Sequence, residues 1–365
     1  MSIVNIMWAG GAAYVSVHKV HQQILSQAAP GVSVSSWLLQ GQGSCCNDAA
    51  TREWHLSSRL LKGKHVWKLL QPWMRGRFYA ALKQANTRVL LLDGLGVSRL
   101  ILPLLRQLPD VHATIVFHGK TRLHRGDVAL LRSFQAPQVR LVAVSQTLAA
   151  DLQQELGMPV QVLRSALEPE GFRQALLERE AARHLLGLPQ ESGPVLGAVG
   201  RLVDSKGFDH LLDAFALAHR QRPDMRLVIL GEGNQRSVLE ARIKALGLEA
   251  AVTLYGHCTE LFRLYRAFDW VLVPSRSEGL GLVLQESVMA DVPVLCSDLP
   301  VFREQLGDAG HYIAVGDVAA WGEAIVERVG IEGKPVAKAQ YQALAPERAW
   351  QHFSQLSSDL LQSAQ

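Results

Sequence analysis

The chain has 365 residues, which is longer than one hydrophobic core usually serves, so we expect two domains of ordinary size. Hydrophobic residues make up 48% of it and charged residues 19%, which excludes a disordered chain and is typical of a globular protein. The four cysteines show no CxxC spacing or Cys/His cluster, which argues against a disulfide framework and against a structural zinc site.

The first half of the chain repeats short β-branched runs, separated by stretches long enough for helices. The runs are mostly continuous rather than alternating in polarity, as expected for strands buried on both faces of a parallel sheet. The apolar start, residues 2–13, has no basic leader and soon reaches Gly10-Gly11, so we interpret it as a strand rather than a signal sequence. The expected strands are Ile3–Trp8, Val32–Leu39, Arg88–Leu92, Ala113–Phe117, Val139–Val144 and Val160–Leu163.

A basic, aromatic segment runs from Arg52 to Lys83. It carries about eight Lys or Arg against one acid. Its aromatic residues are Trp54, Trp67, Trp73, Phe78 and Tyr79. One interpretation is a surface for anionic lipid head groups, where the rings lie at the boundary and the cations meet phosphate. The other is an ordinary basic helical hairpin with buried aromatics. No module for RNA or DNA is visible, so we do not expect a nucleic-acid partner.

The second half repeats the strand and helix pattern. Its expected strands are Val195–Val199, Arg226–Leu230, Ala251–Tyr255, Trp270–Val273, Val292–Cys296 and His311–Val315. Helical patterns over 207–220 and 235–246 lie between them. Turn-rich residues 168–171 separate the two halves and precede a helix expected over 175–186. We therefore predict an α/β protein with two doubly wound, Rossmann-like domains, 1–170 and 171–345, and a C-terminal helix at 346–365 that packs back on the first domain.

An anion site is predicted directly after the first strand of the second half. The loop reads Gly200-Arg201-Leu202-Val203-Asp204-Ser205-Lys206-Gly207 and leads into a helix. Glycines and a helix N-terminus expose backbone N–H groups, while Arg201 and Lys206 add full charges. A diphosphate is the natural ligand. The loop is neither a Walker sequence nor a GxGxxG fingerprint, which disfavours ATP hydrolysis and nicotinamide binding. The plain alternative is a glycine turn with two exposed cations.

A second ligand loop follows about 70 residues later, after the strand Trp270–Val273. It reads Pro274-Ser275-Arg276-Ser277-Glu278-Gly279-Leu280-Gly281, and a helix starting near Leu282 carries Glu286. The glycines let a ligand approach the backbone, and carboxylates suit sugar hydroxyls because they accept strong hydrogen bonds. The alternative is that Glu278 caps the helix and Glu286 lies on a solvated face.

Together the patterns GxLxxxKG and ExxxxxxxE, the latter headed by EG[FL]GL, resemble the donor domain of glycosyltransferase family 4. The resemblance covers roughly residues 190–310 and implies retaining enzymes with the GT-B fold, in which two domains face a central cleft. It extends more weakly to the first half, through Gly10-Gly11 and His118-Gly119. Within the family, the chain is similar to transferases of bacterial lipopolysaccharide cores and envelope polysaccharides.

The resemblance implies roles by position. Arg201 and Lys206 would hold the donor diphosphate, Glu278 would contact the donor sugar, and His118 would reach that sugar from the facing domain. Glu286 would bind the nucleotide ribose. The implied donor-binding residues are Gly10, Gly11, Gly200, Gly207, Gly279, Leu280, Gly281, Leu282 and Glu286.

The expected reaction moves a hexose from a nucleoside-diphosphate sugar, with UDP-sugar favoured, to a saccharide or glycolipid acceptor. Positive charge on the leaving diphosphate should be the main catalytic contribution, so we expect neither metal nor cofactor. No carboxylate nucleophile is evident, and the resemblance favours front-face attack with His118 orienting the sugar, although a role as base stays open. The alternatives are a sugar-nucleotide epimerase and a non-catalytic nucleotide-sugar-binding protein.

The location expected from these features is the cytoplasm, because no stretch approaches the roughly 18 apolar residues that a membrane-spanning helix needs. Peripheral attachment to the inner face of the cytoplasmic membrane would follow if residues 52–83 meet anionic lipid. The basic balance of the first half supports an anionic partner there, since residues 1–173 hold about 19 Lys and Arg against about 9 Asp and Glu.

Overall fold

The structure is a computed structural model that describes residues 2–10, 14–41, 51–57, 59, 61, 69–188, 193–258, 260–329 and 331–362. The chain divides into two compact units, Met1–Ser165 with Gln351–Gln365, and Ala166–Trp350. The division falls slightly before the joint that we expected at residue 170, because Ala166 and Leu167 already group with the second unit. The expected third segment, 346–365, is shared between the two units.

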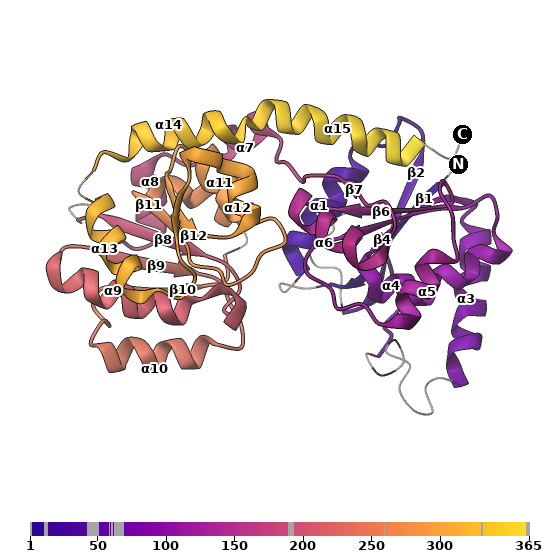
Figure 1. Cartoon of the computed structure of the whole chain (residues 1–365), viewed down its shortest axis with the longest axis horizontal. Coiled ribbons are helices and arrows are strands. Elements are labelled where there is room, and N and C mark those ends of the chain that lie inside the picture. The colour runs from indigo at the N-terminus through magenta and orange to yellow at the C-terminus, as the bar shows by residue number, and fades with distance from the viewer. Residues whose placement is uncertain are drawn as a thin grey trace. The chain divides into compact units, whose positions relative to one another are not determined.

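The first unit is built on a seven-stranded parallel sheet in the order β3-β2-β1-β4-β5-β6-β7 (Figure 1). Its strands are β1 (Ser2–Ala9), β2 (Ser33–Gln40), β3 (Thr51–Glu53), β4 (Thr87–Asp93), β5 (His112–Phe117), β6 (Val139–Ala143) and β7 (Gln161–Val162). The central strands are buried along nearly their whole length, as their continuous apolar sequences predict. The short edge strand β3 was not predicted.

Helices connect these strands as crossovers. They are α1 (Val15–Leu25), α3 (Gln71–Gln84), α4 (Gly94–Ile101), η3 (Leu102–Gln107), α5 (Arg125–Arg132) and α6 (Gln146–Leu156). The last helix, α15 (Pro346–Gln362), begins in the second unit and ends in the first. It buries Phe353, Ser357, Leu360 and Leu361, a helical stripe, so the expected packing of the C-terminal helix on the first unit is confirmed.

The second unit has a six-stranded parallel sheet in the order β10-β9-β8-β11-β12-β13 (Figure 1). Its strands are β8 (Val195–Val199), β9 (Arg226–Leu230), β10 (Val252–Gly256), β11 (Trp270–Val273), β12 (Val294–Ser297) and β13 (His311–Ile313). The predicted positions of β8, β9 and β11 match the structure residue for residue. This confirms the α/β class with two doubly wound parallel sheets.

The helices of the second unit cover this sheet. They are α7 (Pro169–Ala175), α8 (Arg179–Leu185), η4 (Asp204–Lys206), α9 (Phe208–Gln221), α10 (Arg236–Leu246), η5 (Leu261–Ala267), α11 (Leu282–Met289), α12 (Pro300–Leu306), η6 (Gly307–Ala309), α13 (Val318–Val329) and α14 (Gly333–Leu344). The helix expected over 175–186 corresponds to α8, whereas the residues expected to form a turn, 168–171, lead into the additional helix α7. Among the described residues, no helix is both long and apolar enough to cross a membrane.

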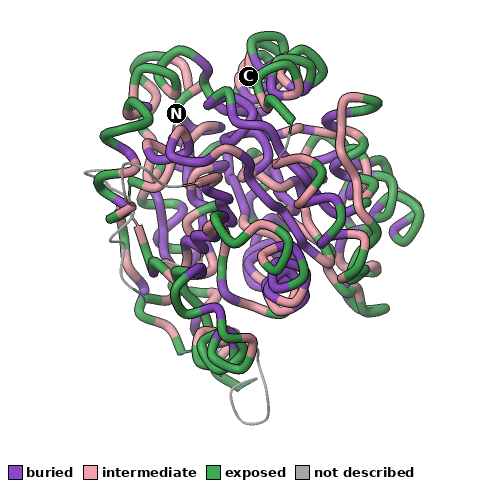
Figure 2. The backbone as a smooth tube through the Cα atoms, turned by 90° about the vertical axis from the view of Figure 1, so that its left-hand side faces the viewer, coloured by how far each residue is buried: buried purple, intermediate pink, exposed green. Residues whose placement is uncertain are grey.

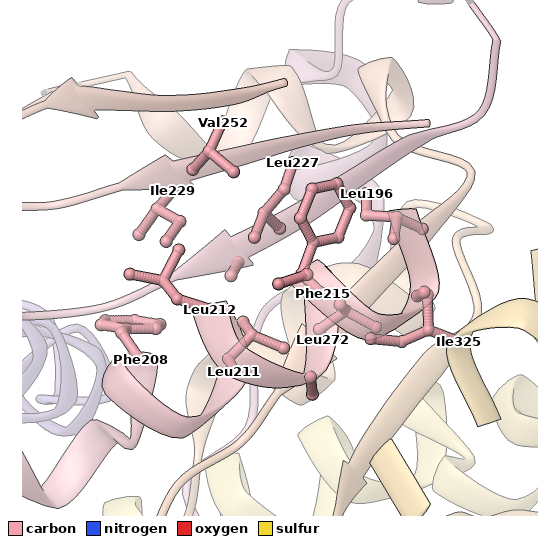
Figure 3. Packing of buried hydrophobic residues seen from close by; sticks show 14 of the residues in the cluster. Leu196, Phe208, Leu211, Leu212, Phe215, Leu227, Ile229, Val252, Leu272 and Ile325 are labelled. Carbon is pink, nitrogen blue, oxygen red and sulfur yellow. The ribbon is translucent and has the colours of Figure 1, made fainter. Parts of the chain in front are cut away.

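The core of the second unit fixes the start of α9. Figure 3 shows Leu211, Leu212 and Phe215 of this helix turned toward strand residues such as Leu227 and Ile229. All five are essentially inaccessible to solvent. Figure 2 shows the same segregation along the backbone, with buried residues inside and exposed ones at the periphery. Because burying each large apolar side chain stabilises by roughly 1.5–3 kcal/mol, this packing anchors the loop that precedes α9.

Candidate functional site

Each sheet has a point at which the strand order reverses. In the second unit the reversal lies between β8 and β11. Strand β8 pairs on one side with β9, the next strand along the chain, and on its other side with β11. In the first unit the same reversal lies between β1 and β4. Ligands of open α/β sheets bind at the carboxyl ends of the strands at such points. Both loops singled out in the sequence, 200–207 and 274–281, follow β8 and β11. They therefore lie at the strand-order reversal of the second unit.

The first loop is shaped by glycines at its ends. Gly207 has φ +67°, and a Cβ atom there would lie 2.2 Å from the carbonyl oxygen of Pro274 in the other loop. Gly231, which follows β9, would bring a Cβ to 1.8 Å from the Gly200 carbonyl oxygen. Side chains cannot fit at either position. Helix α9 starts right after Gly207, so the positive end of its dipole lies at this loop.

The two predicted cations of this loop have different surroundings. Arg201 is exposed, and no ion pair of this side chain occurs within the described part of the chain. Lys206 is partly buried and pairs with Glu278, 72 residues away, through Nζ and Oε1. The Ser275 hydroxyl donates to the same Glu278 oxygen at 2.7 Å. The structure therefore brings Lys206 and Glu278 together, as the predicted site requires, and pairs them directly.

Arg276 fastens the second loop to the first. Its backbone N–H donates to the Ser205 carbonyl at 2.8 Å, and its guanidinium donates to both carboxylate oxygens of Asp209 at 2.9 and 2.7 Å. The guanidinium also reaches the Asp204 carbonyl. Arg276 lies inside the second loop, but its sequence position alone predicted no role because its partners are remote in sequence.

Glu286 lies on α11, and the structure excludes the solvated-face alternative because this residue is only 5% exposed. Its Oε2 accepts a hydrogen bond of 2.7 Å from the hydroxyl of Tyr265, a fully buried residue of η5. Burial, and then the carboxylate of Glu286, raise the pKa of Tyr265 well above its usual range. Tyr265 thus stays a hydrogen-bond donor that orients Glu286. No sequence signal identified it.

The other residues of the second loop shape its backbone. Gly281 has φ +85° and precedes Leu282, the first residue of α11. Leu280 is buried, and its carbonyl oxygen accepts a hydrogen bond from the Gln305 side chain at 2.6 Å. The predicted helix start at Leu282 is therefore confirmed, with Gly279 and Gly281 in the turn that leads to it.

In the first unit, His118 directly follows β5 and contacts buried polar groups. Its Nε2 lies 3.0 Å from Nε2 of His21 on α1 and 4.0 Å from Oδ1 of Asp93 at the end of β4. Burial, and then the neighbouring His18, lower the pKa of His118 to about 3. Burial also lowers the pKa of His21 and raises that of Asp93. His21 and His118 are therefore held mainly in their neutral forms.

His21, Asp93 and His118 also bear on the expectation that no metal binds. Their potential ligand atoms all lie within 4.8 Å of one another, and they form the one such group among the described residues. No sequence pattern predicted this grouping, because His21 lies on helix α1, Asp93 ends strand β4 and His118 follows strand β5.

The two predicted glycines of the first unit have different outcomes. Gly10 follows β1, and its N–H donates to the Gln40 carbonyl at 3.0 Å. Gly11 lies outside the described residues. Two of the four cysteines, Cys45 and Cys46, also lie outside them.

The basic aromatic segment is described only in part, and Trp67 lies outside the described residues. Trp54 and Phe78 are buried and stack with ring centroids 3.9 Å apart. In contrast, Trp73 is 59% exposed and Leu69 is 80% exposed at the start of α3. The described aromatics thus divide between the core and the surface. Burial in the core accounts for Trp54 and Phe78, and the lipid-surface interpretation stays a prediction for the exposed Trp73.

Comparison with known proteins places these features in a family context. Residues 187–333 match the family described as Glycosyl transferases group 1. The chain is 29% identical over 238 residues to the 2-deoxystreptamine glucosyltransferase of Streptomyces kanamyceticus, covering 60% of each protein. It is 29% identical to the lipopolysaccharide core biosynthesis mannosyltransferase LpsB of Rhizobium meliloti, covering 60% of this chain and 63% of that protein. The matches to the first curated relatives thus span about half to three fifths of their lengths.

Solved structures resemble the whole chain. WaaG, a glycosyltransferase involved in lipopolysaccharide biosynthesis, superposes with a TM-score of 0.76 at 18% identity and 99% coverage of both chains. HepE of Anabaena, in complex with UDP and glucose, has a TM-score of 0.75 at 17% identity, covering 100% of this chain and 98% of its own. The chain has the GT-B fold. The region that matches the family, residues 187–333, contains the loops 200–207 and 274–281 of the second unit.

Proposed function

We propose that this chain is a retaining glycosyltransferase of family 4 that transfers a hexose from a nucleoside-diphosphate sugar, with UDP favoured, to a saccharide. The observation that carries the proposal is the convergence of Lys206, Arg201 and the start of α9 with Glu278 at the strand-order reversal of the second sheet. The match of this region to Glycosyl transferases group 1 supports it. So does the likeness to HepE, whose structure contains UDP and glucose.

The proposed chemistry rests on charge at the leaving group. As the bond to the sugar breaks, the diphosphate gains negative charge and the sugar gains cationic character. Arg201, Lys206 and the N–H groups before α9 would stabilise that charge more strongly in the transition state than in the bound donor, which is what accelerates a reaction. This arrangement would make a metal ion unnecessary for departure of the diphosphate.

The remaining residues would position the donor. Glu286, oriented by Tyr265, would bind the ribose. Glu278 would accept hydrogen bonds from sugar hydroxyls, while Lys206 would contact both Glu278 and the diphosphate. Gly10 and Gly11, which have no side chains, would let the donor approach the chain closely. His118 would orient the sugar rather than act as a general base, because a group with a pKa of about 3 is a weak proton acceptor near neutral pH.

For the acceptor, we propose a saccharide or glycolipid of the cell envelope, such as a lipopolysaccharide core. LpsB and WaaG are both named for lipopolysaccharide biosynthesis. The exposed Leu69 and Trp73 beside Arg77 fit an anionic membrane surface, with Arg77 5.1 Å from the ring of Trp73. The proposed location is the cytoplasm, with peripheral attachment to the inner face of the cytoplasmic membrane.

A donor screen tests the proposed reaction. The chain is heated with each of a panel of nucleotide sugars, and the true donor should stabilise it by about 2.7 kcal/mol at 100 times its Kd. That donor is then incubated with oligosaccharide acceptors. Release of nucleoside diphosphate and a product with the donor's anomeric configuration are expected. An isomerised donor would instead indicate an epimerase, binding without turnover a binding protein, and an inverted product would contradict the retaining assignment.

Vesicle sedimentation tests the proposed membrane surface. Binding to vesicles with anionic lipid should weaken as salt rises, since exposed charges are screened over about 10 Å at 0.1 M. Trp73→Ala should weaken binding, whereas Leu185→Ala, which removes another exposed apolar residue, should not. Equal binding to neutral vesicles, or equal loss in both variants, contradicts the proposal.

A further inference from the structure

A chain of buried polar contacts crosses the first unit and ends at His118. Asn5 on β1 donates from Nδ2 to the Ser36 hydroxyl of β2 at 3.3 Å. Its Oδ1 lies 2.7 Å from Nδ1 of His21, whose Nε2 lies 3.0 Å from Nε2 of His118. Asn5 and His21 are at most 3% exposed, and the His118 side chain is 14% exposed. Water therefore competes little for these contacts.

These contacts set the position of each proton. Because the Asn5 amide nitrogen faces Ser36, its oxygen faces His21 and can only accept, so Nδ1 of His21 carries a proton. A buried neutral imidazole has one N–H, which leaves Nε2 of His21 as an acceptor. Two facing ring nitrogens at 3.0 Å need one proton between them, and that proton must then belong to Nε2 of His118.

We propose that Asn5 and His21 are positioning residues that hold His118 as the Nε2–H tautomer, so that its Nδ1 accepts a hydrogen bond from a substrate hydroxyl. This inference rests on the proposed function, in which the substrate is a sugar. A fixed tautomer turns an imidazole that could donate or accept into one that only accepts at Nδ1. It therefore recognises a group that carries a proton, as every sugar hydroxyl does.

The neighbouring groups are compatible with this tautomer. Asp93 accepts from the backbone N–H of Trp8 at 3.0 Å through Oδ2, and its Oδ1 is 4.0 Å from Nε2 of His118, too far for a hydrogen bond. Asp93 thus does not take the His118 proton away from His21. His18 is engaged with the Ala9 carbonyl, at 2.9 Å from its Nε2. A metal ion held by His21, Asp93 and His118 would instead require both facing nitrogens to be unprotonated.

Nitrogen NMR of the full chain with labelled histidine tests the tautomer directly. His118 resonances are assigned by their loss in His118→Gln. We expect Nδ1 of His118 to be unprotonated and Nε2 to carry the proton. His21→Leu removes the acceptor and should release the tautomer preference, whereas the Gln side chain of His21→Gln can still accept and should retain it. A proton on Nδ1 of His118 in the unsubstituted chain overturns the proposal.

Two further measurements complete the test. If one equivalent of Zn²⁺ shifts the resonances of His21 and His118 together, these residues form a metal centre and the proposal is overturned. With a donor and acceptor from the screen, His21→Leu should lower kcat/KM about tenfold, and His21→Gln should recover most of that loss. An unchanged kcat/KM in His21→Leu overturns the substrate contact. If no transfer is found at all, the proposed function fails while the NMR result still decides the tautomer.

Discussion

The strand-order reversals of the two sheets share a topology but differ in their electrostatics. In the second unit, Lys206 and Glu278 remain partly accessible and face each other as an ion pair, with Arg201 exposed nearby. In the first unit, His21 and His118 are buried, and their pKa values are lowered by burial and by neighbouring histidines. The depth of burial thus decides whether such a site offers charge or neutral hydrogen-bonding groups. The proposed function places leaving-group stabilisation at the charged site and sugar orientation at the neutral one.

The largest effect should come from removing the charge of Lys206. We expect Lys206→Ala to lower turnover by about 10² to 10³, as for the loss of one transition-state stabiliser. Steady-state kinetics with the donor from the screen measure this, with Lys244→Ala on exposed helix α10 as the control. If turnover stays within about threefold of the unsubstituted chain, Lys206 does not stabilise the leaving group.

The loop clamp should matter next. Arg276→Ala removes a two-pronged ion pair with Asp209, and hydrogen bonds to charged groups contribute about 1.5–3 kcal/mol, so nucleotide affinity should fall about 10- to 100-fold. Arg276→Lys should recover little of it, because an ammonium cannot form the fork. Calorimetric titration measures the affinity, and exposed Arg220→Ala serves as the control. Full recovery by Lys would mean that charge alone, not loop geometry, matters here.

A smaller effect is expected for Tyr265→Phe, which removes the hydroxyl that donates to buried Glu286. Leaving the carboxylate short of a donor should cost about 1–2 kcal/mol of unfolding free energy. Urea denaturation measures it, and Tyr255→Phe provides a partly exposed control. Unchanged stability together with unchanged nucleotide affinity would show that Glu286 does not depend on Tyr265.

The smallest effect is an acid dependence of stability in the first unit. The folded pKa values of His21 and His118 lie below the ordinary value of 6.5, so below that pH the unfolded chain binds more protons. Stability should therefore fall as pH drops from 6.5 toward 3, although protonation of Asp93, whose pKa is raised, opposes this at the acid end. Denaturation at pH 7.5 and 5 should show a smaller difference in His118→Gln than in the exposed-residue control His352→Gln. Equal differences would contradict the neutral character of this site.

Much of the fold could be predicted because its signals are local. Continuous apolar runs marked β8, β9 and β11, and glycines marked the turn before α11. The edge strand β3 was missed because three residues carry too weak a pattern. The helix expected over 175–186 was too long at both ends, because Leu176 and Glu178 are extended and α8 begins only at Arg179.

The site was predictable where its chemistry lies within one motif. Lys206 and Glu278 were recognised from spacing, although not as partners. Tyr265, Arg276 and Asn5 were missed because each acts through a residue 16 or more positions away. For His21 the sequence offered only a weak indication of a polar site, namely that it follows His18 by about one helical turn on α1.

The amino-acid sequence by itself determined the two parallel sheets and the glycine loops at their strand ends, because hydrophobic periodicity and backbone freedom act over a few residues. Only the tertiary structure decided that Lys206 pairs with Glu278, that Glu286 is buried against Tyr265, and that His118 is neutral and bonded to His21. The physical reason is that ion pairing and protonation depend on distance and desolvation. Both are properties of side chains brought together from remote parts of the chain.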